Sequence, residues 1–338
     1  MQSILAVTIP FFALVLCGYL AARQHVLPEA AIPGLNAFVL FFALPCMLFR
    51  FGASMPLARL LDPVLIAIYL GGALLMVLFT IALTLRRHAD GPGVPMKDAA
   101  FGALVAAFPN SGFMGFPLLI GLLGEGVAGP LIGCILIDLV VTSSLCLALA
   151  QLRPATETSS RQPLLPSFAR AMRGAFSNPL PWAIALGALV AATGLALPGP
   201  LTEIVRLLGD AATPVALFTI GAVLWRAQQH ATTRTPPSAY VPVALIKLLI
   251  HPLLMLAGGV IANAAGAEVS QFALLVLLLN AALPSASNVA ILAERYGADN
   301  GRITRIIMVS TALAFVSFSL VAWAVSYTHL TLPTNREV

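Results

Sequence analysis

The chain has 338 residues, of which 59% are hydrophobic and only 9% are charged, whereas roughly a quarter of the residues in an ordinary soluble domain are charged. This composition excludes a soluble globular protein. The net charge of +5 comes from basic residues between long apolar runs, a distribution that membrane topology explains better than nucleic-acid binding does. The 4 cysteines lie inside apolar runs without metal-ligand spacing, so neither a metal site nor a cofactor is expected.

Ten apolar runs long enough to cross a bilayer follow one another along the chain. The first run is expected to remain as a membrane span, because no basic residue precedes it and no small-residue cleavage site follows it. The sequence therefore predicts an all-α integral membrane protein with ten transmembrane helices. The predicted spans are 3–22, 31–51, 63–85, 97–122, 130–152, 180–197, 202–225, 241–262, 270–293 and 304–325.

The longest polar connection, 153–179, divides the chain into halves of five predicted spans each, 1–152 and 180–325. Most of the 18 Lys and Arg residues lie in or beside the odd-numbered connections, which the positive-inside rule places in the cytoplasm. Both termini are therefore predicted to be periplasmic, and the second half is predicted to enter the membrane inverted relative to the first. The tail, 326–338, is abruptly polar; it is assigned no function and is a candidate sequencing artefact.

Two sequence patterns recur at equivalent places in the two halves. The pattern P-x-x-L-F-x-x-G-A occupies 45–53 and 214–222, in the second span of each half. The fourth span of each half contains a proline followed by small and amide residues, within 107–112 and 282–288. Matches at the same ordinal positions, together with the odd number of spans per half, predict two inverted five-helix repeats.

The two mid-span prolines predict breaks in the fourth and ninth helices. A proline removes a backbone donor, and the exposed peptide groups are tolerated at membrane depth only inside protein or beside a polar cavity. A half-helix that begins after such a break directs its N–H groups and positive dipole end towards the cavity, which suits a carboxylate. The alternative is a proline kink whose polar neighbours satisfy the freed carbonyls. The predicted substrate-site residues are Pro109, Asn110, Ser111, Pro284, Ser285, Ser287 and Asn288.

Several ionisable side chains lie inside or at the end of predicted spans. Asp138 is the candidate for coupling transport to H⁺ or Na⁺, with a structural aspartate bonded to Thr142 or Ser143 as the alternative. Lys247 and His251 are further coupling candidates, because they lie four residues apart on one helix face and could meet an anion or Asp138. Lys247 could instead extend to the membrane interface. Arg50 is a candidate to screen an anion at the outer mouth.

Four stretches carry a family resemblance: 108–118 (FPNSGFMGFPL), 124–126 (GEG), 282–288 (ALPSASN) and 293–297 (AERYG). With them the chain resembles, over nearly its whole length, the auxin efflux carrier family, and within it the bacterial branch described as malonate transporters. The resemblance implies ten helices in two inverted repeats with broken helices 4 and 9 crossing, as in bile-acid symporters and sodium–proton antiporters. It also implies a substrate carboxylate held near Asn110 and Asn288, and movement of the crossing against a scaffold.

The predicted function is secondary active transport of a small organic anion, malonate or a similar carboxylate, across the bacterial cytoplasmic (inner) membrane by alternating access. Two alternatives are a sodium-coupled organic-anion symporter of the bile-acid type, marked by sodium-dependent uptake, and a non-transporting membrane receptor. An enzyme is not expected, because the sequence has no H-E-x-x-H or G-x-S-x-G motif and no paired catalytic aspartates. The expected partners are the substrate and the lipid bilayer, with a homodimer left open.

Overall fold

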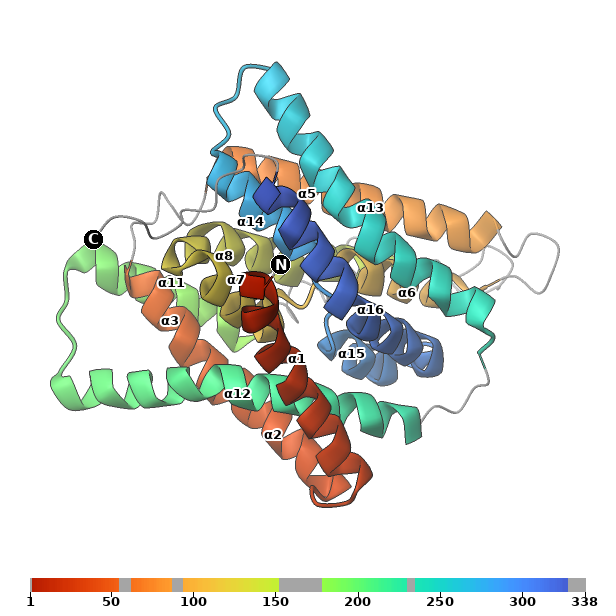
Figure 1. Ribbon diagram of the computed structural model, residues 1–338, viewed down its shortest axis with the longest axis horizontal. Coiled ribbons are helices and arrows are strands. Elements are labelled where there is room, and N and C mark those ends of the chain that lie inside the picture. Colours follow the sequence, from red (N-terminus) through yellow and green to blue (C-terminus); the bar gives the residue numbers. More distant parts are fainter. Residues whose placement is uncertain (1, 55–61, 87–93, 152–177, 230–234, 328–338) are drawn as a thin grey trace.

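The protein is helical throughout the residues that the computed structural model describes, which are 2–54, 62–86, 94–151, 178–229 and 235–327 (Figure 1). Within these ranges no strand occurs, and 7 helices are long and apolar enough to cross a membrane by length and composition. The prediction of an all-α membrane protein is confirmed. Nearly all of the predicted linker 153–179 and of the tail 326–338 lies outside the described ranges, apart from 178–179 and 326–327.

The helices of the first half follow the predicted apolar runs closely, with several interruptions. Within three of these runs the helix passes through a short π-helical stretch, in which the backbone winds more widely than in an α-helix. The elements are α1 (Gln2–Arg23), η1 (Glu29–Ala31), α2 (Ile32–Phe38), η2 (Val39–Ala43), α3 (Leu44–Ser54), α5 (Pro63–Arg86), α6 (Met96–Ala107), η3 (Ser111–Gly115), α7 (Phe116–Leu123), η4 (Glu125–Val127), α8 (Ala128–Leu136), η5 (Ile137–Thr142) and α9 (Ser143–Ala150).

The second half contains longer uninterrupted helices and one clear break. Its elements are α11 (Pro179–Thr193), α12 (Gly199–Gln229), α13 (Pro237–Ala264), α14 (Gln271–Ala281), α15 (Asn288–Tyr296) and α16 (Asn300–Tyr327). This break lies between α14 and α15, and the first half has a break between α6 and η3.

Polar and glycine residues set several helix ends. The Asn178 side chain accepts a hydrogen bond from the N–H of Leu180 (3.0 Å), and Pro179 follows at the first helical position. The Asp62 carboxylate caps α5 in the same way, accepting from the N–H groups of residues 64 (2.9 Å) and 65 (3.2 Å). Gly194 and Gly297, both with φ 64°, end α11 and α15 in the left-handed conformation that favours glycine.

Four glycines allow two helix pairs to approach backbone to backbone. A Cβ atom on Gly18 or Gly221 would lie 1.8 Å from a backbone oxygen of the facing helix, where α1 crosses α12. A Cβ on Gly52 or Gly187 would lie 2.8 Å or 2.3 Å from a backbone oxygen, where α3 packs on α11. Figure 1 shows α12 crossing both α1 and α3. These four helices make their most extensive contacts with one another, and we call them the α1/α3/α11/α12 group.

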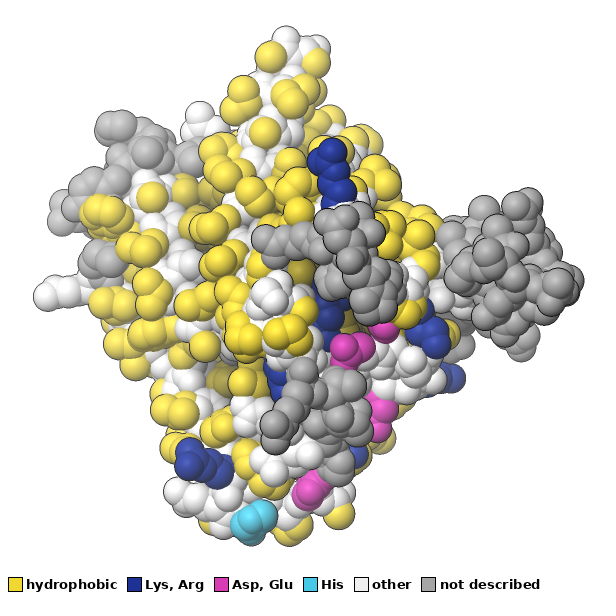
Figure 2. Space-filling model, turned by 90° about the vertical axis from the view of Figure 1, so that its right-hand side faces the viewer, with side chains coloured by type: hydrophobic (Ala, Val, Ile, Leu, Met, Phe, Trp, Pro, Cys, Tyr) yellow, Lys and Arg dark blue, Asp and Glu magenta, His cyan; other side chains and the backbone are white. Residues whose placement is uncertain are grey.

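The remaining long helices form a second group, comprising α5, α6, α13, α14 and α16, with α8 and α9 packed against them. Arg302 joins several members of this group at one end, and its side chain is only 7% exposed. Its guanidinium donates to the carbonyls of Ala239 (2.9 Å) and Asp98 (3.1 Å) and to the Thr84 hydroxyl (3.5 Å). In Figure 2 the acidic side chains and several Lys and Arg side chains lie around the centre and lower right, while hydrophobic side chains cover much of the left and upper parts.

The glycine contact between α1 and α12 makes a testable prediction. We expect Gly221→Ala to lower the thermal unfolding midpoint in detergent, because the added methyl group would overlap the Val15 carbonyl, and overpacking costs about 1–3 kcal/mol. Gly71→Ala is the matched control, since a Cβ at this mid-helix position of α5 meets nothing within 4 Å. Equal midpoints for the two variants would contradict the close approach of α1 and α12.

Candidate functional site

Two broken helices meet at Pro109 and Pro284, and each break satisfies backbone groups of the other. The N–H of Asn110 donates to the carbonyl of Pro284 (2.9 Å), and the N–H of Ala286 donates to the carbonyl of Phe108 (3.0 Å). These two bonds flank an isolated antiparallel bridge between Pro109 and Ser285. The exchange explains how non-helical backbone can be buried among apolar helices without leaving these groups unpaired.

A tight turn at Asn110 restarts the first broken helix. Asn110 has φ −79° and ψ 53°, and the N–H of Ser111 donates to the carbonyl of Pro109 (2.8 Å), which together define an inverse γ-turn. The Asn110 carbonyl then accepts from Met114 (3.0 Å) and Gly115 (2.9 Å), opening η3. The amino end of η3, with its unsatisfied N–H groups and positive dipole end, therefore begins at the crossing.

All seven predicted substrate-site residues lie in the two breaks or at the first position after them. Asn110, Ser111 and Ser285 are at most 3% exposed. The side-chain oxygens of Ser111, Ser285 and Asn288 are buried without a hydrogen-bond partner among the described residues. Leaving a buried polar atom unpaired costs about 1–3 kcal/mol, so such atoms are rare and call for an explanation. Their grouping around one crossing fits a site that completes its hydrogen bonds with a polar ligand.

Asp138 is fully buried in the π-helical stretch η5 and accepts hydrogen bonds from two other helical turns. The Tyr69 hydroxyl of α5 donates to one carboxylate oxygen (2.7 Å), and Thr142 donates to the other (3.3 Å). The amide of Asn280, on α14, donates in turn to the Tyr69 hydroxyl (3.4 Å). The hydrogen bond from Thr142 is the one expected if Asp138 were a purely structural aspartate. It is, however, one part of a network that also includes Tyr69 and Asn280. π-helical stretches of this kind are frequent at functional sites.

Lys247 and His251, both on α13, lie in the same buried region. Lys247 is fully buried, donates to the carbonyl of Ala281 (2.8 Å) and lies 2.9 Å from Nδ1 of His251. It also interacts electrostatically with Asp138. Ala281 is the last residue of α14, so the ammonium group sits at the negative end of this half-helix, next to the break. The expectation that Lys247 could extend to the membrane interface is wrong, because its side chain points into the protein.

The structure adds three side chains that the sequence analysis did not single out: Tyr69, Asn280 and Ser310. Asn280 lies four residues before Pro284, and its Oδ1 is buried without a partner among the described residues. The Ser310 hydroxyl of α16 accepts from the N–H of Ser285 (3.2 Å), tying α16 to the crossing. Tyr69 and Asn280 are isolated polar residues in apolar runs, and Ser310 stands beside Thr311 in another. The proximity of Asn280 to Pro284 was the one signal that could have identified it.

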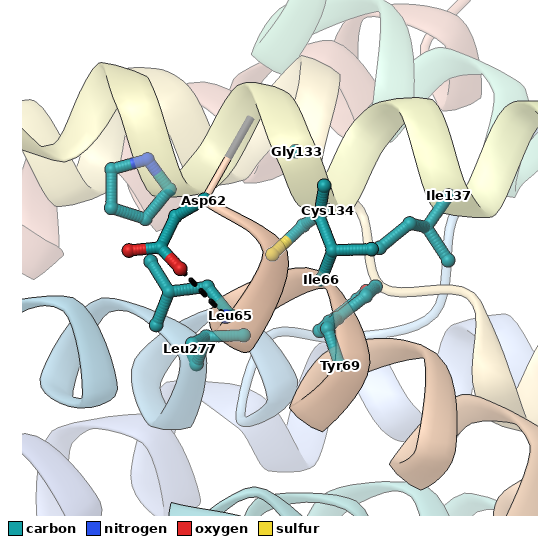
Figure 3. A pocket seen from close by; sticks show the side chains of 9 residues that line it. Asp62, Leu65, Ile66, Tyr69, Gly133, Cys134, Ile137 and Leu277 are labelled. Atoms are coloured by element: carbon teal, nitrogen blue, oxygen red, sulfur yellow. Dashed lines mark hydrogen bonds between the residues drawn. The ribbon is translucent and has the colours of Figure 1, made fainter. Parts of the chain in front are cut away.

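A narrow cavity of about 10 Å³ runs between α5, α8 and α14 towards Tyr69 (Figure 3). This volume suits about one water molecule. Asp62 lies at one end of the lining and Tyr69, two turns further along α5, lies at the other. The cavity therefore extends from the partly exposed start of α5 towards the Tyr69–Asp138 pair. Its lining residues are Asp62, Leu65, Ile66, Tyr69, Pro130, Gly133, Cys134, Ile137 and Leu277.

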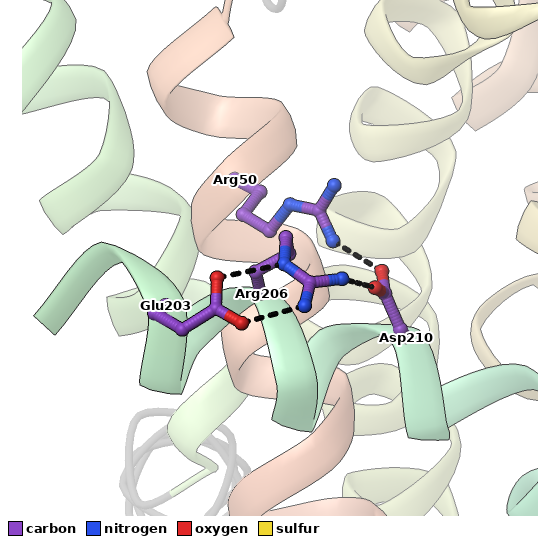
Figure 4. A network of polar contacts seen from close by, with 4 residues as sticks. All are labelled: Arg50, Glu203, Arg206 and Asp210. Carbon is purple, nitrogen blue, oxygen red and sulfur yellow. Dashed lines mark hydrogen bonds and ion pairs between the residues drawn. The ribbon is translucent and has the colours of Figure 1, made fainter. Parts of the chain in front are cut away.

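Arg50, the candidate for screening an anion, belongs to an ion-pair network between α3 and α12 (Figure 4). Its guanidinium lies 2.6 Å from Asp210, which also pairs with Arg206 (2.9 Å), and Arg206 pairs with Glu203 (2.6 Å). These side chains are about half exposed, so each pair stabilises the fold only modestly. Because two carboxylates accompany the two arginines, the network carries no excess positive charge.

No cluster of three or more His, Cys, Asp or Glu residues that could hold a metal ion occurs in the part of the chain that the structure describes. The crossing itself offers hydrogen-bonding groups and the positive ends of helix dipoles. Hydroxyl groups from serines, amide groups from asparagines and the amino ends of two half-helices converge there, which can bind an anion.

One family model and several known proteins are similar to the chain over most of its length. A family model described as "Membrane transport protein" matches residues 3–322. The chain is 30% identical over 319 residues to a protein of Rhizobium meliloti (strain 1021) named "Putative malonate transporter", with 93% of both chains covered. It is 25% identical to the "Uncharacterized transporter YfdV" of Escherichia coli (strain K12), covering 93% of this chain and 94% of the relative. It is 22% identical to "Auxin efflux carrier component 8" of Arabidopsis thaliana, covering 87% and 89%.

The electrostatic link between Asp138 and Lys247 can be tested by a double-mutant cycle. We expect Asp138→Asn or Lys247→Met alone to lower the free energy of unfolding by about 1–3 kcal/mol, because each leaves a buried polar group of its neighbours without its hydrogen-bond partner. The double variant should lose less than the sum, by about 0.5–3 kcal/mol. Denaturant titration in detergent measures these energies.

Lys247→Met combined with Glu203→Gln serves as the control, because Glu203 is exposed and pairs with Arg206 on α12. That combination should be additive. Additivity of the Asp138 and Lys247 substitutions as well would show that the two charges do not stabilise one another.

Proposed function

The chain belongs to the Membrane transport protein family, and we propose that it is a secondary active transporter of a small organic anion. It is a multi-pass membrane protein of a transporter family rather than an enzyme. Malonate or a similar carboxylate is the proposed substrate, and the bacterial inner membrane is the proposed location. The relative named as a malonate transporter supports the substrate class. The observation that carries the proposal is the crossing of two broken helices, with unpartnered buried oxygens beside their bridge.

We propose that ten segments cross the membrane as two inverted repeats of five. Two equivalent contacts support this arrangement. The glycine contact between α1 and α12 joins the first span of the first half to the second span of the other half. The glycine contact between α11 and α3 joins the first span of the second half to the second span of the first. An approximate two-fold axis relating the halves would generate this pair of contacts.

The proposed orientation places both termini in the periplasm. Contacts at one end of the molecule support it, because they join the basic ends of several helices. Arg226, near the end of α12, pairs with Glu29 (3.5 Å), and Lys97, at the start of α6, donates to the carbonyl of Gly297 (3.3 Å). Arg302 lies at the same end of α16 and reaches α6. The positive-inside rule puts these residues on the cytoplasmic side.

In this proposal the substrate carboxylate binds at the crossing, between the amino ends of η3 and α15. Asn110, Ser111, Ser285, Ser287 and Asn288 supply amide and hydroxyl groups, while Pro109 and Pro284 keep the breaks open. The second helix group, which contains the crossing, moves against the α1/α3/α11/α12 group to expose the site to each side in turn. The helices of each group contact one another more extensively than they contact the other group, which supports this division.

We further propose that Asp138, Lys247 and His251 couple this movement to a gradient of H⁺ or Na⁺. The network reaches the crossing by two short links. One is the bond of Lys247 to Ala281, which ends α14, and the other is the chain from Asp138 through Tyr69 to Asn280. A change in the charge state or cation occupancy of this network would act directly on the carboxyl end of α14, where the break begins.

Counterflow in proteoliposomes tests the substrate class without assuming a driving ion. We expect labelled malonate to enter vesicles that are preloaded with unlabelled malonate, with saturable kinetics. Asn110→Ala should reduce counterflow at least about tenfold, because losing one hydrogen bond to a charged ligand costs about 1.5–3 kcal/mol. Asn263→Ala is the control, since Asn263 is exposed near the end of α13.

Equal loss in both asparagine variants would argue against a site at the crossing. Absence of counterflow with malonate and with a panel of mono- and dicarboxylates, in protein that remains folded, would refute the carboxylate assignment.

The coupling role of Asp138 predicts a separation of two activities. We expect Asp138→Asn to keep counterflow of malonate and to lose accumulation driven by a gradient, because exchange does not require the empty carrier to return. Imposing a pH gradient alone and a sodium gradient alone on the wild-type protein identifies the ion. Gradient-driven accumulation by Asp138→Asn at the wild-type level would remove Asp138 from the coupling mechanism.

A further inference from the structure

The narrow cavity between α5, α8 and α14 joins a partly exposed carboxylate to the buried Asp138 network. Its lining includes Asp62, which is partly exposed, and Tyr69, which is fully buried and donates to Asp138 (2.7 Å). Figure 3 shows the Cys134 side chain between these two ends. The volume of about 10 Å³ suits one water molecule, for which Asp62, Tyr69 and the Cys134 thiol supply polar contacts.

The lining of this cavity is poorly suited to a dehydrated metal cation. Among the lining residues, Asp62 and Tyr69 alone carry side-chain oxygen atoms, and they lie two helical turns apart, about 11 Å along the helix axis. The other side chains are apolar, except for the Cys134 thiol. Hard cations prefer several oxygen ligands at once, whereas a proton needs only one water and the next acceptor. The cavity therefore favours H⁺ over Na⁺ as the ion that reaches Asp138.

Titratable side chains from α5, α8 and α13 lie around Asp138. Tyr69 donates to its carboxylate, and Cys134 and Lys247 interact with it electrostatically. His251 lies 2.9 Å from the Lys247 ammonium, and its ring centre lies 6.2 Å from that of Tyr69. Protonation of Asp138 would remove the counter-charge of Lys247, whose ammonium also binds the last carbonyl of α14. A proton delivered to Asp138 would thus act on the helix that leads into the break.

We propose that this cavity is the entry site for the coupling proton, in which one water molecule passes H⁺ from Asp62 towards Tyr69 and Asp138. The inference rests on the proposed function and adds to it the identity of the ion and its route. In the proposed orientation the start of α5 faces the periplasm, so the proton enters from that side. Gly133 of α8 lines the cavity without a side chain and so leaves room for the water.

The transfer leaves Tyr69 neutral. The Asp62 carboxylic acid, protonated from the periplasmic water, gives its proton to the cavity water, which gives a proton to the Tyr69 oxygen. The Tyr69 hydroxyl at the same time gives its own proton to the Asp138 carboxylate, along the hydrogen bond that joins them. One O–H bond forms on Tyr69 and one breaks. The net result is one proton moved, with Asp62 ionised again and Asp138 neutral.

The first test measures water access without transport. Cys134 and Cys146 are both buried, 2% and 1% exposed, and of the two Cys134 lines the cavity. In proteins that keep one of these thiols and carry alanine for the other cysteines, infrared spectroscopy in D₂O follows the loss of the S–H stretching band. The Cys134 thiol should exchange at least about tenfold faster, because exchange at Cys146 requires local opening of the structure.

Filling the cavity should remove this difference. Gly133→Ala places a methyl group in a space of about one water and should slow the Cys134 exchange to near the Cys146 rate. Gly71→Ala is the matched control on α5, since its Cβ meets nothing within 4 Å, and should leave the Cys134 exchange unchanged. If the Gly133 variant does not fold, Ile66→Phe narrows the cavity from α5 instead.

The second test measures malonate accumulation in oriented proteoliposomes. With the periplasmic side acidic relative to the lumen, Asp62→Asn should lower the initial rate about tenfold, because a carboxylate at the mouth concentrates H⁺ there. Asparagine keeps the oxygen that caps α5. The deficit should shrink as the outside pH falls, since more H⁺ then reaches the cavity unaided, and counterflow should change much less. Glu268→Gln, which removes an exposed carboxylate between α13 and α14, is the control.

The possible outcomes separate the two proposals. If a pH gradient drives accumulation but Asp62→Asn and Gly133→Ala both behave like their controls, the entry site is refuted and the transport function stands. Accumulation driven by a sodium gradient alone would refute H⁺ as the ion, and equally slow exchange at Cys134 and Cys146 would refute a water in the cavity. If no carboxylate is transported yet Gly133→Ala slows a fast Cys134 exchange, the water site stands and the transport proposal fails.

Discussion

The exchange of backbone hydrogen bonds between the two helix breaks is the constraint on which the rest of the architecture depends. Phe108 and Pro284 offer carbonyls that their own helices do not use, and Asn110 and Ala286 offer the matching N–H groups. Without this exchange the peptide groups would be unpaired among apolar helices, which costs several kcal/mol for each group. The pairing lets two polar half-helix ends meet inside the protein, and it fixes their distance and direction. The side chains of the buried serines and asparagines are available to bind a ligand because the backbone groups beside them already have hydrogen-bond partners.

Two kinds of packing surround this crossing and suit different tasks. The α1/α3/α11/α12 group is held by glycine contacts in which backbones touch, an arrangement that needs no polar side chains and tolerates little change of shape. The helices that carry the crossing are held by buried polar links, from Arg302 at one end to the network of Tyr69, Asp138 and Lys247 near the break. Bonds of the second kind can change partners when a charge or ligand changes, so they can support two arrangements of the same helices.

The sequence predicted the helices well because membrane spans are encoded in runs of apolar residues, which need no knowledge of tertiary structure. The breaks at Pro109 and Pro284 were predictable for a similar local reason, since proline acts on its own turn of helix. Thr142, a neighbour in the sequence, was predicted as a partner of Asp138, but Tyr69 and its link to Asn280 were not. Tyr69 and Asn280 are far from Asp138 along the chain, and one polar residue in an apolar run does not reveal which way it faces. The burial of Lys247 likewise depends on the position of the Ala281 carbonyl, which only the packed structure shows.

The bridge between Pro109 and Ser285 has a consequence for biosynthesis, because its two residues lie in opposite halves of the chain. A ribosome completes the first break long before residue 286 exists. Until then, the Phe108 carbonyl and the Asn110 N–H lack the partners that they have in the finished protein. The first half must therefore wait in the membrane with its break facing water, the insertion machinery or other nascent helices. Synthesis of residues 284–286 is then the event that supplies these partners, and a chain truncated before them would keep the Phe108 carbonyl and the Asn110 N–H without the bonds of the finished protein.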